Sequence, residues 1–303
     1  MSATMAAAAA DGPNARGLAR DALAERLRLL GLGAPAFLLV TAAMVVPVLW
    51  LFWLSFVGDD GRMTLEHYRR MIEQPSYGRT FVATFQVSLL TTAICAVAGY
   101  PLAYALSQMP RRAANLCLIA VLLPFWTSLL VRTYAWLVLL QRKGLINAWG
   151  MQLGLWDEPL ALVHNLTGTL IGMVHIMLPL FVLPVLGTMR SIDRDYLKAA
   201  ANLGASPARA FRTVFFPLSL PGVVAGSLIV FIICLGFYVT PAVLGGGKVT
   251  MVSNRIANDI ELFFNWGAAS ALGVVLLVLA LAFLWLASRL LRLDRLLGGG
   301  HRT

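Results

Sequence analysis

Residues 191–217, SIDRDYLKAAANLGASPARAFRTVFFP, form a polar, Ala-rich segment between two long apolar stretches. Ser191 is expected to cap a first helix, and Gly204 to end it in the left-handed conformation that glycine adopts readily. Ser206 followed by Pro207 is typical of the N-cap and first turn of a second helix. The segment therefore predicts a helical hairpin that connects two apolar segments.

Each predicted helix of this hairpin has one apolar face at helical spacing. The two faces consist of Tyr196, Ala199, Ala200 and Leu203, and of Phe211, Val214 and Phe215. Pro217 is expected to end the second helix. The hairpin either lies on a membrane surface or docks into a groove of another subunit, which small Ala side chains would allow to approach closely.

The rest of the chain indicates a membrane protein. Hydrophobic residues make up 59% of its 303 residues and charged residues 13%, against about 45–50% and 25% in soluble domains. A bilayer core about 30 Å thick needs roughly 20 apolar helical residues. Six stretches qualify: 35–57, 81–107, 115–140, 166–187, 219–239 and 267–288. We expect an all-α protein with a polar arm (1–30), a six-helix domain (31–290) and a tail (291–303).

The net charge of +10 is concentrated in alternate loops. The excess of Lys and Arg lies in the arm, at Arg111 and Arg112, in the loop 188–217 and in the tail, whereas the other loops are balanced. Because basic loops stay inside the cell, both termini and the loop 188–217 are predicted to be cytoplasmic. The charge is therefore a topology signal, and we expect no nucleic-acid partner.

The hairpin resembles the "EAA" loop of binding-protein-dependent ABC importer permeases. That loop has Glu-Ala-Ala, three residues, Gly, nine residues and then aliphatic-x-Leu-Pro. The matching positions are Lys198, Ala199, Ala200, Gly204, Val214, Phe216 and Pro217. Lys replaces the Glu of the pattern and Phe replaces its Leu. Five further segments resemble the spermidine/putrescine branch of the family: residues 99–104, 123–136, 144–147, 236–241 and 265–269.

The resemblance implies a type I (MetI-like) permease fold in a bacterial inner membrane. It also implies three kinds of protein partner: a dimer of ATPase subunits that binds ATP–Mg, a second permease subunit and a periplasmic solute-binding protein. The chain itself would hold no cofactor and catalyse no reaction. A polyamine is the expected solute. Another small organic solute is the alternative, and an ion-coupled secondary transporter is a more distant one.

Candidate contacts for a solute lie mainly in the third predicted span and near the ends of the fifth and sixth. No Asp or Glu occurs in the six stretches, so a cation would be held by aromatic faces, carbonyl dipoles and acids at the mouth. The candidates are Trp126, Ser128, Arg132, Tyr134, Phe237, Tyr238, Asp259 and Glu261. Arg132 either faces the path or extends to the headgroups, and Trp136 and Trp266 also suit an interfacial belt.

Further residues predict how the helices bend and pack. Pro124, Ser128, Arg132 and Trp136 are four residues apart and would share one helix face, with a kink at Pro124 that Thr127 or Ser128 relieves. His175 suits a hydrogen-bonded packing role, and Gly222 and Gly226 suit close helix contact. The three Cys residues fall in apolar segments and predict no disulfide. No catalytic constellation, metal-ligand spacing or P-loop is present in the sequence.

Overall fold

A computed structural model describes residues 13–58 and 61–290 of the chain. It divides into two units, and the described part of the first is mainly helix α2 (Pro13–Leu54). The portion long and apolar enough to cross a membrane is Gly33–Leu54. The polar arm expected over residues 1–30 is thus helical from Pro13 onward, while residues 1–12 and the predicted tail lie outside the described residues.

The second unit contains the other predicted spans. Four uninterrupted helical segments are long and apolar enough to cross a membrane: α4 (Pro75–Gln108), α8 (Leu166–Ser191), α10 (Pro207–Ala210) continuing into α11 (Phe216–Leu235), and α14 (Trp266–Leu290). With α2 this makes five such helices in the described residues. A sixth span exists if a bent pair is counted as one crossing.

The bent pair stands where the sequence predicts a single third span with a kink at Pro124. Helices α5 (Arg111–Leu122) and η1 (Leu123–Trp126) form its first arm, and α6 (Leu129–Leu140) and α7 (Leu145–Gln152) its second, at an angle of 97°. Pro124 offers no backbone N–H, and Thr127 and Ser128 are extended, with ψ of 150° and 136°. The Thr127 hydroxyl donates to the Pro124 carbonyl (2.7 Å), as expected. Pro124 therefore does not share a helix face with Arg132, and that prediction is wrong.

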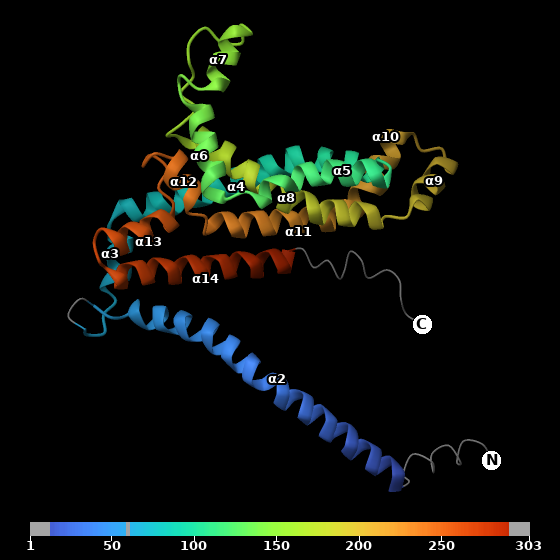
Figure 1. Cartoon of the computed structure of the whole chain (residues 1–303), viewed down its shortest axis with the longest axis vertical. Coiled ribbons are helices and arrows are strands. Elements are labelled where there is room, and N and C mark those ends of the chain that lie inside the picture. Colours follow the sequence, from blue (N-terminus) through green and yellow to red (C-terminus); the bar gives the residue numbers. More distant parts are fainter. Residues whose placement is uncertain (1–12, 59–60, 291–303) are drawn as a thin grey trace. The chain divides into compact units, whose positions relative to one another are not determined.

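The core lies where α4, α8 and α11 run side by side (Figure 1). Its buried residues include Val87, Cys95, Met177, Phe181, Val185, Val230 and Cys234. Gly222 and Gly226 of α11 allow the close approach of α8. A Cβ atom at Gly226 would lie 2.8 Å from the Phe181 carbonyl oxygen, and one at Gly222 would lie 2.6 Å from Thr188 Oγ1. The predicted helix contact at this glycine pair is confirmed.

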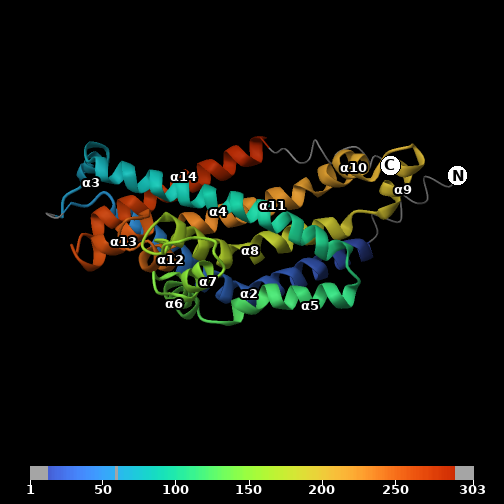
Figure 2. The same cartoon turned by 90° about the horizontal axis from the view of Figure 1, so that it is seen from above.

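The short helices gather at the two ends of this bundle (Figures 1 and 2). At one end, α9 (Arg194–Asn202) and α10 form the hairpin between α8 and α11. At the other end lie α3 (Glu66–Glu73), α12 (Val239–Leu244) and α13 (Val252–Glu261). The chain thus presents one hairpin at one end and several short elements at the opposite end.

Candidate functional site

The hairpin between α8 and α11 is defined by side-chain and backbone caps. The Asp193 carboxylate accepts the Asp195 backbone N–H at 2.9 Å and caps α9. The prediction that Ser191 caps this helix is wrong, because α8 continues through Ser191. A carboxylate is favourable at this position, since it also interacts with the positive end of the helix dipole.

The reversal at Gly204 follows the sequence prediction. Gly204 has φ +81°, the left-handed conformation. Its N–H donates to Ala201 O at 2.9 Å, and the N–H of Ala205 donates to Ala200 O at 3.0 Å. The Ser206 hydroxyl then caps α10, whose first residue is Pro207. The local conformational preferences of Gly204 and Ser206 thus set the end of α9 and the start of α10.

The second arm does not end at Pro217 as expected. A π-helical turn, η2 (Phe211–Phe215), follows α10, and the Phe216 N–H donates to the carbonyl of Phe211. Pro217 cannot donate a backbone hydrogen bond, and it lies just after this π-helical turn, where the regular i→i−4 pattern is already interrupted. The second arm and the fifth span therefore form one helical segment, Pro207–Leu235.

Aromatic rings attach the base of the hairpin to α4. Tyr104 meets the rings of Phe211 and Phe215 edge-on, with centroids 5.2 and 5.3 Å apart. Tyr100 packs on Phe216 at 5.6 Å, and its hydroxyl is hydrogen-bonded to Ser219 Oγ at 3.0 Å. The base of the hairpin is consequently held against the bundle core.

The tip of the hairpin is open. In α9, the expected apolar face is exposed at Tyr196, Ala199 and Leu203, and Leu203 is 89% exposed. Leu197, on another side of α9, packs on the core. The remaining motif positions differ in their exposure. Lys198 forms an exposed ion pair with Asp195 at 2.8 Å. Ala200 and Val214 are half-buried, whereas Phe216 and Pro217 are exposed.

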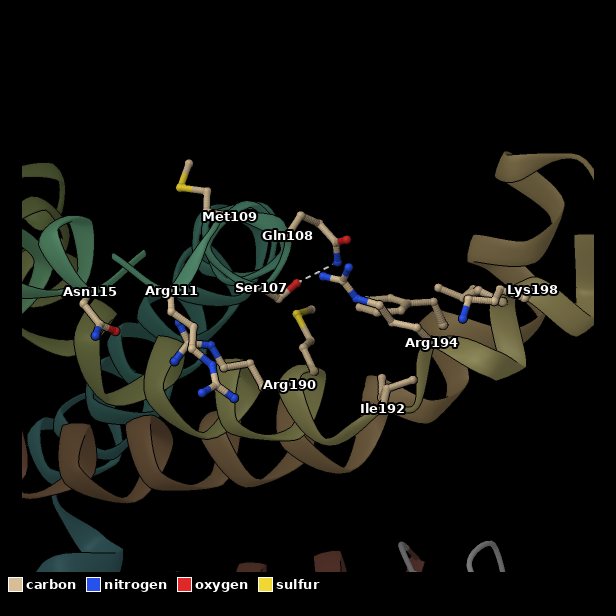
Figure 3. Close-up of a pocket in the computed structure, with 12 residues that line it drawn as sticks. Ser107, Gln108, Met109, Arg111, Asn115, Arg190, Ile192, Arg194 and Lys198 are labelled. Atoms are coloured by element: carbon tan, nitrogen blue, oxygen red, sulfur yellow. Dashed lines mark hydrogen bonds between the residues drawn. The ribbon is translucent and has the colours of Figure 1, made fainter. Parts of the chain in front are cut away.

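A cavity of about 720 Å³ lies between α9 and the ends of α4, α5 and α8 (Figure 3). Its lining includes four basic residues: Arg111, Arg190, Arg194 and Lys198. The sequence does not predict this cavity, because the basic residues that line it indicate only which side of the membrane their loops occupy. Their spacing along the chain gives no indication that the span ends converge.

The candidate path residues of the third span are largely on the surface of this chain. Trp126 is 90% exposed, and Ser128 and Tyr134 are exposed as well. The Arg132 guanidinium lies over the Phe125 ring, 5.7 Å from its centroid. Its Nε and Nη1 atoms are buried, and they have no hydrogen-bond partner among the described residues.

The other candidates lie at the end of the bundle that holds α13. The hydroxyl of Ser253 donates to the Phe237 carbonyl at 2.7 Å, and the amide of Asn254 donates to the Tyr238 carbonyl at 3.1 Å. Both donors belong to the first turn of α13. Tyr238 is exposed and Phe237 is partly buried against the core.

The two acids expected at the mouth have different environments. Asp259 is buried and paired with Arg255, whose Nε lies 3.1 Å from Oδ1. Burial raises the pKa of Asp259, and Arg255 partly offsets this effect. Glu261 is exposed. Thus Glu261 is the acid of the two that is open to solvent.

A second cavity, about 440 Å³ and mostly apolar, lies between α4, α6 and α8. Trp136 and His175 line it, and the indole Nε1–H donates to His175 Nδ1 at 3.0 Å. The predicted hydrogen-bonded role of His175 is confirmed. Among the residues that the structure describes, no group of three His, Cys, Asp or Glu could hold a metal ion.

Comparison with known proteins agrees with this architecture. Residues 6–293 match the family described as "Binding-protein-dependent transport system inner membrane component", and the chain belongs to this family. It is 32% identical over 255 residues to the spermidine/putrescine transport system permease protein PotB of Escherichia coli (strain K12), covering 81% of this chain and 92% of that protein. The corresponding protein of Haemophilus influenzae is 32% identical over 250 residues, covering 80% and 87%.

A solved structure shows the same fold. A chain of the bacterial alginate ABC transporter, crystallised with an alginate pentasaccharide-bound periplasmic protein, superposes with a TM-score of 0.72 at 15% identity. The match covers 90% of this chain and 95% of the other. The family and the fold confirm the predicted class: the chain is a multi-pass inner-membrane permease component of an ABC importer.

Proposed function

We propose that this chain imports a polyamine, such as putrescine or spermidine, together with a second permease subunit. A periplasmic binding protein delivers the solute, and two separate ATPase subunits bind and hydrolyse ATP–Mg. The names of the E. coli and H. influenzae relatives support the choice of solute. The chain itself acts as a transport subunit and not as an enzyme.

The observation that carries the coupling role is the contrast between the two parts of the hairpin. Its tip exposes Tyr196, Ala199 and Leu203, while its base is fixed by rings to α4. A partner groove that moves α9 would displace the continuous helical segment from α10 into α11. Because packed helices shift as units, this displacement would reach the core.

The proposed solute path relies on aromatic rings rather than carboxylates. No span in the described residues contains Asp or Glu. Exposed Trp126, Tyr134 and Tyr238 offer ring faces to a cation, and Glu261 offers a charge. Specificity would then rest mainly on the binding protein. The unpaired Arg132 guanidinium would repel a polycation that passed close to it. This repulsion favours another small organic solute as the second candidate.

Substitutions in the hairpin test the coupling role. Gly204→Pro forces φ to about −65° where the structure has +81°, and Ala200→Glu places a charge on the docking face. Each should lower solute-stimulated ATP hydrolysis of the reconstituted complex about tenfold or more. Ala201→Glu is the matched control, since it lies about 100° around the helix. Normal stimulation in both variants, with normal insertion, would exclude the docking role.

Uptake assays test the solute. Proteoliposomes that contain the whole complex should accumulate labelled putrescine or spermidine only with ATP inside and binding protein outside. Failure of both polyamines, with uptake of a different solute, would reassign the specificity. Accumulation driven by an imposed proton gradient without ATP would instead support an ion-coupled transporter.

A further inference from the structure

The cavity beside α9 gathers basic side chains from three helices. We propose that it binds the phosphate-bearing headgroup of an anionic phospholipid. Four cationic side chains line it, and no acid does (Figure 3). The remaining polar lining consists of Ser107, Gln108 and Asn115, which can hydrogen-bond a phosphate or a glycerol group.

The arginines are free to bind an anion. In the described part of the chain, the guanidinium groups of Arg111, Arg190 and Arg194 make no hydrogen bond or ion pair, and Lys198 alone is paired, with Asp195. Like charges gathered around one cavity repel each other. A phosphodiester removes this repulsion, and it matches the planar donor fork of arginine.

The position of the cavity favours a lipid over a soluble anion. Its lining comes from the last residues of α4 and α8 and the first turns of α5, which are the ends of apolar helices. On α5, Arg111 and Asn115 are followed at the same four-residue spacing by Ile119, which is 60% exposed, and Leu116 beside it is 70% exposed. These residues share one helix face. A headgroup in the cavity would therefore continue into acyl chains along an exposed apolar row.

The predicted orientation places this cavity on the cytoplasmic side, where basic pockets between membrane helices bind acidic headgroups. Arg194 and Lys198 belong to α9, whereas Arg111 and Arg190 belong to α5 and α8. A bound lipid would thus link the hairpin tip to two membrane helices. This consequence, unlike the binding itself, rests on the proposed coupling function.

Lipid titration of the purified whole complex tests the proposal. Thermal unfolding is followed with added phosphatidylglycerol, phosphatidylcholine or inorganic phosphate, and native mass spectrometry counts bound lipid. Phosphatidylglycerol alone should raise the unfolding temperature and remain bound. The double variant Arg111→Gln/Arg190→Gln should bind it about tenfold more weakly. The control Arg209→Gln/Arg212→Gln, in the same hairpin but outside the cavity, should bind it normally.

Three results would overturn the proposal. An equal response to phosphatidylcholine would show that charge is not recognised. An equal response to inorganic phosphate would assign the cavity to a soluble anion. No phosphatidylglycerol response in the wild-type complex would show that the cavity does not bind the lipid headgroup. All three are read from binding, so they are independent of whether polyamines are transported.

Discussion

Asp259 is a buried carboxylate near one end of the bundle. Its side chain is 5% exposed, Oδ1 accepts from Arg255 Nε, and Oδ2 is buried without a hydrogen-bond partner among the described residues. Arg255 also lies over the Tyr77 ring, 4.8 Å from its centroid. Burial raises the pKa of the carboxyl more than Arg255 lowers it. The folded protein therefore favours the protonated form more than the unfolded chain does.

This imbalance predicts a pH dependence of stability. A raised pKa means that the folded state binds more protons than the unfolded chain. The contribution of Asp259 to the free energy of unfolding is therefore greatest below about pH 3.9, and it is lost as the pH rises through the folded-state pKa. Asp259→Asn should remove this loss. Thermal unfolding of both proteins at several pH values should show a difference in unfolding temperature that changes across that window.

Glu261→Gln serves as the control for this measurement, since the Glu261 side chain is exposed two residues away. It should leave the pH dependence as in the wild type. A constant difference between wild type and Asp259→Asn at every pH would contradict the prediction.

At the scale of elements, the contact of α8 with α11 depends on the absence of side chains at two positions. A Leu at Gly226 would overlap the Phe181 backbone, because even Cβ would lie 2.8 Å from its carbonyl oxygen. Gly226→Leu should destabilise the protein by about 1–3 kcal/mol through overpacking. The loss is measurable as a lower unfolding temperature in detergent.

Gly187→Leu is the matched control, because Gly187 lies on α8 and a Cβ atom there would meet no neighbouring atom within 4 Å. It should be neutral or slightly stabilising, since leucine favours helix over glycine. Equal destabilisation by the two substitutions would show that the helix contact is not the cause.

The ring contacts at the base of the hairpin are expected to transmit its movement to α4. Tyr104→Ala removes two edge-on contacts, each worth about 0.5–1.5 kcal/mol. Membrane insertion should persist, while less solute should enter for each ATP hydrolysed. Tyr104→Phe retains both ring contacts and should retain the wild-type ratio. A wild-type ratio in Tyr104→Ala would mean that the hairpin transmits motion without these rings.

For the whole molecule, the bent pair decides the topology. If it crosses the membrane once, Met63 and Ala201 lie on opposite sides, because three crossings separate them. If it enters and leaves on one side, two crossings separate them and they share a side. The basic loops favour the first arrangement, with Ala201 inside.

Single-cysteine labelling distinguishes these arrangements. In a background that lacks Cys95, Cys117 and Cys234, a membrane-impermeant maleimide on intact cells should modify Met63→Cys and not Ala201→Cys. Opening the cells should make Ala201→Cys reactive. Labelling of both positions from outside would favour a re-entrant pair and five crossings.

The sequence by itself determined the features that depend on short-range physics. Hydropathy placed the apolar segments, because about 20 apolar residues suffice to cross a bilayer whatever surrounds them. Gly204 and Ser206 set the reversal of the hairpin through backbone conformation and capping, which involve only neighbouring residues. The spacing of the loop motif likewise identified the permease family.

Only the tertiary structure decided the features that combine distant residues. The sequence predicts a kink at Pro124 but not the 97° turn that follows it, because a proline alone does not specify an angle. The burial of Asp259 and the continuation of the helix through Pro217 depend on packing against other elements. The basic cavity joins residues near 110 with residues near 190 and 198, which hydropathy and local preference treat as independent. Such convergence follows from the packing of whole helices, and no short stretch of sequence contains it.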